Sequence, residues 1–477
     1  MFLWKKYKQL PIQAKASLWY TICSFLQKGI SLIVVPIYVR LLTTGEYGEW
    51  NVFQAWRDIL IIFASLNLSA GVFTKTLVDR EDCRDAYTSS MQALGTLITC
   101  GMLVLYLLLR PAANRLLHLN TPLMLLLFLY FIVYPAFSFW GTRQRVEYRY
   151  KPMVVLTVLM SLLTPTVSLL LLRFTDLRAK AMILGYLLVQ CGVGLVFYVV
   201  QFWRGKCFYS REFWLYALRF NIPLVPHYLS LIVLNQADRI MIEHYCGESD
   251  AGIYSFAYQL GYAINVLISA INGSRVPWTY EQFKNKVYDR LKPITNSLAL
   301  MLGAAVLLVS LMAPEVIKIL GTAEYTSAMY VIPVVTLGIY YTYVYDLYAS
   351  IEFYFAAPKF VMYASVTGAL LNVVLNAIFI PRFSFIAAAY TTLACYLVFM
   401  LMHFLFSRRV LRREKITDPV YDNKALFGIS ALVTAVCLAS MLTFTYPLLR
   451  LGLALALLGV CYLRRNAIKQ LLTTIKK

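Results

Sequence analysis

The chain has 477 residues, of which 60% are hydrophobic and 14% are charged, whereas an ordinary soluble domain has about 25% charged residues. Its mean hydropathy is +0.66, and 44 Lys and Arg residues against 23 Asp and Glu residues give a formal net charge of +21. This composition excludes a soluble globular enzyme, a disordered chain and a secreted disulfide scaffold, and it predicts a helical multi-pass membrane protein.

Apolar runs of roughly 20 residues, separated by Pro, Gly and charged residues, predict about fourteen membrane-spanning helices. Barrel strands would be half as long and would alternate in polarity. In chain order, the predicted spans are residues 17–40, 47–71, 88–109, 122–141, 153–173, 181–202, 216–242, 252–275, 294–313, 328–349, 361–380, 384–406, 425–445 and 447–463.

Basic residues concentrate in every second loop. One side of the membrane receives the N-terminal tail, the loop around Arg143, the run from Arg275 to Lys292, the cluster Arg408–Lys415 and the C-terminal tail. Such asymmetry places both termini in the cytoplasm, and an even number of spans requires the same arrangement. The asymmetry also accounts for the net positive charge of the chain, so nucleic-acid binding is not needed to explain it. The cluster Arg408–Lys415 is open to two interpretations, an ordinary topology signal or a site for anionic lipid headgroups.

Two other classes of feature are not expected. The nine cysteines are scattered singly, and most lie in apolar runs, so the sequence predicts neither a metal site nor a redox motif. The polar and basic first sixteen residues lead into no short apolar stretch with a small-residue cleavage site, so no cleaved signal peptide is expected.

An internal repeat links the first and seventh spans. The sequence Glu46-Tyr47-Gly48-Glu49-Trp50-Asn51 follows the first, and Asp250-Ala251-Gly252-Ile253-Tyr254-Ser255 follows the seventh. When Gly48 is aligned with Gly252, acidic, aromatic and polar residues also align. An offset of six spans gives both copies the same direction, as in transporters with two six-helix halves. The predicted domains are therefore an N-terminal bundle (1–206), a C-terminal bundle (207–413), and a helix pair with a basic cytoplasmic tail (414–477).

Charged residues within spans are costly and indicate function. Lys28 lies near the middle of the first span and has no acidic neighbour at helical spacing. Arg57 lies in the second span, beside Asp58, and Arg239 follows Asp238 in the seventh. Each of these pairs could also be a structural ion pair, and Arg219 could extend its side chain to the membrane surface.

The eighth and tenth spans each carry a stripe of polar residues along one face. Tyrosine and asparagine side chains in these stripes suit sugar rings and hydroxyl groups, although helix packing is an equal alternative. The predicted substrate cavity consists of Lys28, Arg57, Arg219, Arg239, Tyr258, Tyr262, Asn265, Asn272, Tyr341 and Tyr345. The candidate ion-coupling residues are Asp58, Asp238 and Glu352. No catalytic residue and no cofactor is predicted. A proton or sodium gradient could drive the movement of a substrate through the cavity.

Several motifs resemble a known family. They are Pro36-Ile37-Tyr38-Val39-Arg40-Leu41-Leu42, Phe220-Asn221-Ile222-Pro223-Leu224-Val225-Pro226-His227, Asp238-Arg239-Ile240-Met241-Ile242 and Gly252-Ile253-Tyr254-Ser255-Phe256-Ala257-Tyr258. The chain thereby resembles the polysaccharide transporter family, the Wzx-type flippases of O-antigen and capsule repeat units, within the multidrug/oligosaccharidyl-lipid/polysaccharide exporter superfamily.

This resemblance implies an all-α fold with two pseudo-symmetric six-helix bundles in a V shape, as in multidrug antiporters, plus a C-terminal helix pair. It also implies a bacterial inner-membrane protein that moves an undecaprenyl-pyrophosphate-linked oligosaccharide from the cytoplasmic to the periplasmic leaflet by alternating access. Membrane lipids and the polysaccharide polymerase and chain-length machinery would be its partners. Such a protein is not an enzyme.

Two other classes of function fit the sequence less well, an antiporter and a membrane enzyme such as a glycan polymerase or an acyltransferase. A multidrug or organic-cation antiporter would have the same fold, but acidic cavity residues would be expected, whereas the residues within these spans are mainly basic. A glycan polymerase would need a large periplasmic loop, and an acyltransferase would need a catalytic histidine. The mid-span candidates His227 and His403 have no convincing partner in the sequence.

Overall fold

The computed structural model describes residues 12–69, 72–355 and 357–463, and within these ranges it contains helices and no strand. The protein is thus an all-helical, multi-pass membrane protein, as predicted. The basic N-terminal residues up to Lys8 and the basic C-terminal tail from Arg464 onward lie outside the described residues, and so do most of the residues that the prediction placed in the cytoplasmic tails.

The chain divides into two compact units. Unit 1 consists of Met1–Val34 and Glu49–Gln236, and unit 2 consists of Val35–Gly48 and Ala237–Lys477. The short segment between the first two predicted spans therefore belongs to unit 2. The predicted domain boundaries at residues 206 and 413 stay predictions.

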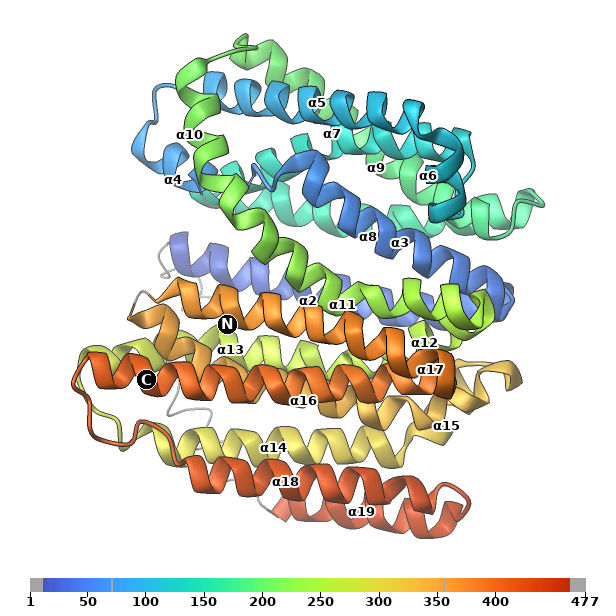
Figure 1. Cartoon of the computed structure of the whole chain (residues 1–477), viewed down its shortest axis with the longest axis vertical. Coiled ribbons are helices and arrows are strands. Elements are labelled where there is room, and N and C mark those ends of the chain that lie inside the picture. Colours follow the sequence, from blue (N-terminus) through green and yellow to red (C-terminus); the bar gives the residue numbers. More distant parts are fainter. Residues whose placement is uncertain (1–11, 70–71, 356, 464–477) are drawn as a thin grey trace, which may run out of the picture. The chain divides into compact units, whose positions relative to one another are not determined.

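Unit 1 is formed by helices that pack along one another (Figure 1). Helix α9 packs against α5, α7 and α8. Aromatic and aliphatic side chains of α4, α5, α7 and α10 form a buried core around Phe73, Tyr87 and Phe139. The helices are α2 (Ile12–Leu41), α3 (Thr44–Ser65), α4 (Val72–Asp79), α5 (Arg84–Leu108), α6 (Arg110–Leu117), α7 (Thr121–Val146), α8 (Tyr150–Phe174), α9 (Ala179–Gly205), α10 (Arg211–Asn221) and α11 (Val225–Cys246), and the last residues of α2, the first of α3 and the second half of α11 belong to unit 2.

Unit 2 is organised around α16, which packs against α12, α13, α14, α17 and α18. Helix α17 is two helices joined at a sharp kink, because Ser384 has the non-helical angles φ 62° and ψ −171°. The helices are α12 (Glu248–Gly261), α13 (Ala263–Lys284), α14 (Leu291–Leu311), α15 (Ala313–Leu320), the 3₁₀ helix η2 (Ala323–Tyr330), α16 (Ile332–Tyr354), α17 (Pro358–Arg413), α18 (Asn423–Ser440) and α19 (Pro447–Leu463).

The predicted spans fall on these helices. In the described part of the chain, nine helices are long and apolar enough to cross a membrane, and η2 with α16 forms a bent pair that would make a tenth. Helix α17 covers two predicted spans, and α19, which covers the last, is a shorter apolar helix. The second predicted span falls on α3, whose apolar sequence is interrupted by charged and polar side chains. The eighth, 252–275, is divided between α12 and α13, because α12 ends at Gly261 and α13 begins at Ala263.

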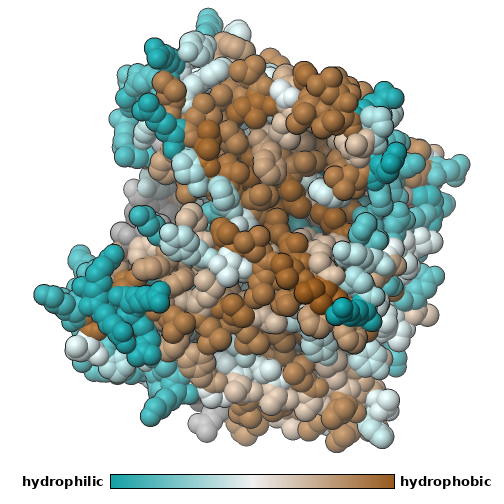
Figure 2. Space-filling view, in the orientation of Figure 1, coloured by the Kyte–Doolittle hydropathy of each residue, from teal (hydrophilic) through white to brown (hydrophobic). Residues whose placement is uncertain are grey.

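The surface fits a membrane environment. Figure 2 shows hydrophobic side chains over the faces of the helices and hydrophilic side chains toward their ends. Large apolar side chains on α8 and α19 are exposed, for example Val155 at 67% and Leu448 at 87%. In water such exposure would be unfavourable, whereas lipid chains cover it without cost. The helix faces are therefore expected to contact lipid.

The two repeated loops meet in unit 2. A Cβ atom added to Gly48 would lie 2.8 Å from the carbonyl carbon of Glu248 and 3.0 Å from the backbone nitrogen of Gly252. A Cβ atom added to Gly252 would lie 3.0 Å from the backbone nitrogen of Gly48 and 3.0 Å from the carbonyl carbon of Thr44. The two aligned glycines thus let the first turns of α3 and α12 cross in backbone contact, and the Thr44 and Ser249 hydroxyls hydrogen-bond beside them at 2.7 Å.

Candidate functional site

Arg57 occupies a largely buried position in unit 1. Its side chain is 11% exposed, and its Nη2 and Nε donate to Asp58 Oδ1 at 2.6 and 3.0 Å. The Asp58 Oδ2 atom accepts a hydrogen bond from Gln236 Nε2 at 2.8 Å. Arg57 Nη1 is buried and has no hydrogen-bond partner among the described residues. The pair with Asp58 that the sequence offered as an alternative is therefore formed, and it leaves the Nη1 amino group of the guanidinium without an acceptor.

Aromatic rings enclose this guanidinium. Arg57 Cζ lies 4.7 Å from the centroid of the Tyr186 ring, in cation–π geometry. The Tyr186 hydroxyl contacts the Tyr130 hydroxyl at 3.3 Å, and Tyr130 stacks on Tyr134 with 4.7 Å between the centroids. Trp50 contacts Tyr186 edge to face at 5.8 Å. A cation in such a setting is weakly hydrated, so it interacts strongly with an anion that reaches it.

Arg275 is a buried arginine that the sequence prediction misplaced. It was assigned to a cytoplasmic loop, but α13 continues to Lys284, and Arg275 is 0% exposed. Its Nη2 donates to Asp346 Oδ2 and its Nε donates to Asn272 Oδ1 at 2.9 Å. Asn272 Nδ2 also donates to Asp346 at 3.0 Å. Arg275 Nη1 is buried without a partner among the described residues, and Cζ lies 5.8 Å from the Tyr343 ring.

The two arginine sites have the same construction. In each, a carboxylate neutralises part of the guanidinium, a tyrosine ring lies against it, and one terminal nitrogen keeps an unused N–H group. A buried donor without an acceptor costs roughly 1–3 kcal/mol and more when the group is charged, so such positions are suited to an anionic ligand. Arg57 lies in unit 1 and Arg275 lies in unit 2.

Asp238 lies at the centre of a second kind of site, in unit 2. It is 1% exposed and accepts three hydrogen bonds, from the Tyr254 hydroxyl at 2.5 Å, Asn376 Nδ2 at 2.7 Å and the Thr392 hydroxyl at 2.7 Å. Asn372 donates to Thr392 at 3.1 Å, and the Thr391 hydroxyl donates to the Asn376 side-chain oxygen. Four helical segments thus place carboxylate, amide and hydroxyl oxygens together in a buried space.

The neighbouring Arg239 is 8% exposed, and its Cζ lies 4.6 Å from the centroid of the Tyr258 ring. Tyr258 stacks on Tyr262 with 6.2 Å between the ring centroids. Asn265 is half-buried one turn further along the chain and accepts a hydrogen bond from the Ser269 hydroxyl at 3.2 Å. The structure therefore brings Arg239, Tyr258 and Tyr262 together, and a role for them in binding a substrate stays a prediction.

Glu352 and His403 form a buried pair. They are 0% and 1% exposed, and His403 Nδ1 lies 2.9 Å from Glu352 Oε1. The second oxygen of Glu352 and Nε2 of His403 have no hydrogen-bond partner among the described residues. Tyr345 stacks on the His403 ring with 5.5 Å between the centroids. This partner of His403 could not be found from the sequence, because the two residues are 51 positions apart.

The remaining predicted residues are dispersed. Lys28 is half-buried in the part of α2 that belongs to unit 1, and Arg219 is exposed in the last turn of α10. The Tyr341 hydroxyl contacts that of Thr434 in α18 at 2.8 Å, so it contributes to helix packing. A role for these three residues in substrate binding stays a prediction.

The fold defines a helical multi-pass membrane protein with charged residues buried among its helices. The structure of the "Lipid II flippase MurJ, inward closed conformation" is similar with a TM-score of 0.67 at 13% identity, covering 94% of this chain and 99% of that chain. The inward-facing conformation of a multidrug resistance MATE family transporter of the MOP superfamily is similar with a TM-score of 0.60 at 14% identity, covering 82% of this chain and 96% of the other. At such identities the similarity shows the fold.

Sequence comparison places the chain in a family. The model of the family "Polysaccharide biosynthesis protein" matches residues 14–283, more than half of the chain. The chain therefore belongs to the polysaccharide biosynthesis protein family. An "Uncharacterized membrane protein" of Haemophilus influenzae is 25% identical over 370 residues, which cover 74% of this chain and 86% of the relative. The family resemblance expected from the sequence motifs is thus confirmed.

Proposed function

We propose that this protein is a flippase that carries undecaprenyl-pyrophosphate-linked oligosaccharide repeat units from the cytoplasmic to the periplasmic leaflet of the bacterial inner membrane. Both termini would be cytoplasmic, and the repeat units would enter O-antigen, capsule or exopolysaccharide synthesis. Membership of the polysaccharide biosynthesis protein family and the fold shared with the Lipid II flippase MurJ support this proposal.

The observation that carries it is the pair of buried arginines with unused donors. A diphosphate linked to a polar glycan cannot cross hydrocarbon unless its charge is offset. Guanidinium groups match phosphate oxygens in geometry, and they stay charged at any physiological pH. Arg57 and Arg275 each keep a buried N–H group free of any described acceptor. The Tyr186 and Tyr343 rings lie against these guanidinium groups, and Tyr186, which is only half-buried, is the candidate for contact with a sugar ring.

A transport assay tests this function. Undecaprenyl-linked repeat units are labelled in cells that lack the protein, and access to the label from the periplasmic face is measured. The wild-type protein should restore access, whereas Arg57→Ala and Lys28→Ala should lower it at least tenfold at equal abundance in the membrane. Arg173→Ala, which removes an exposed arginine at the end of α8, is the matched control. Unchanged sidedness without the protein would refute the substrate class and favour export of drugs or metabolites.

Net transport needs an energy source, and the oxygen-rich site around Asp238 is our candidate for binding the coupling cation. A proton would neutralise the carboxylate, and a sodium ion would find several oxygen ligands within one buried network. Asp58 and Glu352 are the other candidates. Asp58 is 29% exposed and already bound to Arg57, whereas Asp238 accepts its three hydrogen bonds from uncharged groups.

Gradient dependence tests the coupling site separately. Asp238→Asn keeps the shape of the side chain and removes its charge, so it should abolish the stimulation of transport by an imposed sodium or proton gradient. Tyr254→Phe removes one donor and should shift the cation concentration for half-maximal transport without abolishing stimulation. Gradient-stimulated transport by Asp238→Asn at the wild-type rate would refute this assignment and leave the proposed substrate untouched.

A further inference from the structure

A large pocket lies at one end of unit 2, apart from the buried arginine sites. Its volume is about 940 Å³, at the upper end of the 300–1,000 Å³ typical of small-molecule sites. Its walls come from the start of α14, the end of α16, the end of the second half of α17, the loop 414–422 and the start of α18. Figure 2 shows hydrophilic side chains gathered at the edge of the molecule where α17 ends.

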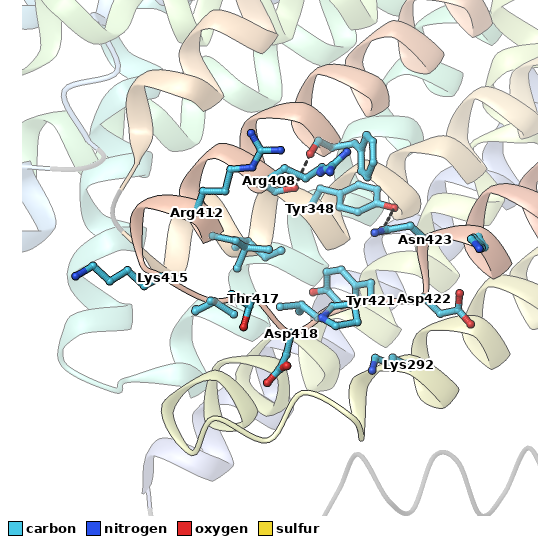
Figure 3. Close-up of a pocket in the computed structure, with 18 residues that line it drawn as sticks. Lys292, Tyr348, Arg408, Arg412, Lys415, Thr417, Asp418, Tyr421, Asp422 and Asn423 are labelled. Atoms are coloured by element: carbon cyan, nitrogen blue, oxygen red, sulfur yellow. Dashed lines mark hydrogen bonds between the residues drawn. The ribbon is translucent and has the colours of Figure 1, made fainter.

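The pocket is strongly basic. Five basic side chains line it, Lys292, Arg408, Arg412, Lys415 and Lys424, against the two carboxylates Asp418 and Asp422. Figure 3 shows Arg408, Arg412 and Lys415 along one side, with Lys292 across from them. Asp422 is occupied as the N-cap of α18, where its Oδ1 accepts from the backbone nitrogen of Ala425 at 3.1 Å.

Most of these cations are not neutralised within the protein. Lys292 pairs with Asp289 at 2.8 Å, but Arg408, Arg412, Lys415 and Lys424 form no ion pair with any carboxylate in the ranges that the structure describes. Arg408 Cζ lies 5.6 Å from the centroid of the Phe404 ring, which leaves the guanidinium edge available. A cluster of like charges around a concave surface raises the local positive potential and favours an anion.

The floor of the pocket is apolar. It is lined by Ile351, Phe404, Leu411, Val420 and the ring of Tyr421. Val420 and Tyr421 are each 2% exposed. The Tyr348 hydroxyl donates to Asn423 Oδ1 at 3.0 Å, which fixes the start of α18 against α16. Cationic side chains beside an apolar floor at the ends of membrane helices suit an amphiphile with a negative headgroup and hydrocarbon chains. A soluble anion would gain nothing from the apolar part.

We propose that this pocket binds an anionic phospholipid of the surrounding leaflet, with its phosphodiester between Arg408, Arg412 and Lys415 and its glycerol backbone over Phe404 and Leu411. Basic pockets at the ends of membrane helices bind such headgroups. The positive-inside asymmetry predicts that this end faces the cytoplasm, where anionic lipids would supply the ligand. The assignment is independent of the transported substrate, because none of the three cations belongs to the proposed diphosphate sites.

Lipid binding to the purified full-length protein, measured by native mass spectrometry, tests the proposal. Dioleoylphosphatidylglycerol and dioleoylphosphatidylcholine are titrated into the detergent-solubilised wild type and into the triple variant Arg408→Gln/Arg412→Gln/Lys415→Gln. The matched control is Lys75→Gln/Arg204→Gln/Arg211→Gln, which removes the same charges from exposed positions of unit 1. The exchange variant Arg408→Lys/Arg412→Lys/Lys415→Arg keeps the charge.

We expect the wild type, the exchange variant and the unit 1 control to prefer phosphatidylglycerol. The pocket triple variant should need at least about tenfold more of it, since each cation near an anionic headgroup contributes appreciably. Equal binding of the two lipids, or equal weakening in both triple variants, would overturn the proposal. If glycerophosphoglycerol displaces bound phosphatidylglycerol at a concentration equal to that of the lipid, the ligand is a soluble phosphate. If geranylgeranyl diphosphate displaces it at a concentration below that of the lipid, the pocket binds the carrier lipid. Either result would refute the phospholipid assignment.

Discussion

Replacement of Gly48 by alanine should disrupt the crossing of α3 and α12 in unit 2. The added Cβ would overlap the Glu248 carbonyl oxygen, and it would lie 2.8 Å from the Glu248 carbonyl carbon and 3.0 Å from the Gly252 nitrogen, whereas nonbonded carbons prefer about 3.5–4.0 Å. Both neighbours are backbone atoms, so no side chain can swing aside, and the two helix starts must separate by roughly 1 Å. Overpacking typically costs about 1–3 kcal/mol, and we expect about 3 kcal/mol here.

Thermal unfolding of the purified protein measures this cost. For a soluble domain the size of unit 2, a change of 1 kcal/mol shifts Tm by about 2–4 °C, so Gly48→Ala should lower Tm by roughly 6–12 °C. Gly45→Ala is the local control, because its Cβ would meet Glu248 at an ordinary 3.9 Å. Gly273→Ala is the helical control, because nothing lies within 4 Å of its Cβ, and it should be neutral or stabilising.

The double variant gives a sharper test. If Gly48→Ala already separates the helix starts, Gly252→Ala should add little, because the same displacement makes room for its Cβ. The cost of the double variant should therefore be well below the sum of the single costs, as expected for residues in direct contact. A Tm for Gly48→Ala equal to that of Gly45→Ala would refute the backbone contact, and strictly additive costs would refute the shared displacement.

Three further predictions concern buried polar groups in unit 2. His403→Ala should cost about 3 kcal/mol or more, because it leaves the Glu352 carboxylate buried without its partner, while the double variant with Glu352→Gln should recover most of the lost Tm. Arg450→Ala should cost less, about 2 kcal/mol, because its ion-pair partner Glu315 is 26% exposed and can be hydrated. Differential scanning fluorimetry compares the Tm values of His403→Ala and Arg450→Ala. Burial raises the pKa of the Tyr421 hydroxyl above its usual value, so its neutral form stabilises the fold below about pH 10, and this contribution falls as the pH rises above it. Tyr421→Phe should therefore gain Tm relative to the wild type between pH 10 and 11.5, and an unchanged difference across that range would contradict the assignment.

The sequence predicted the helices well because the membrane leaves few alternatives. Runs of about 20 apolar residues in lipid must satisfy their backbone groups internally. The errors occur where charges interrupt such runs. The prediction ended the eighth span at Arg275, but the buried residues Arg275, Thr279 and Gln282 continue on one face of α13. That spacing was a signal for a longer helix with a buried polar face.

Pairings between distant helices could not be predicted in this way. Asp346 lies inside an apolar run, which by itself indicates function, but nothing in the sequence links it to Arg275, 71 positions earlier. Arg450 lies near the start of the last predicted span, and nothing in the sequence links it to Glu315, 135 positions earlier, with which it forms a buried ion pair. The repeat aligned Gly48 with Gly252 correctly, while their direct contact depends on the path of the backbone. Sequence periodicity assigns residues to a face, and only the fold assigns them partners.

Helix α16 contributes residues both to buried pairs of charged side chains and to the basic pocket of unit 2. Asp346 and Glu352 lie on it six residues apart and pair with α13 and α17, respectively. Tyr348 and Ile351 lie between them in sequence and line the basic pocket. At about 100° per residue, Asp346 projects to the side opposite Tyr348 and Ile351, whereas Glu352 lies one turn from Tyr348 on the same side. The cations at the pocket rim, Arg408, Arg412 and Lys415, belong to neither buried pair. Their substitution is therefore expected to change lipid binding without breaking the buried pairs, which makes the two proposals separable by experiment.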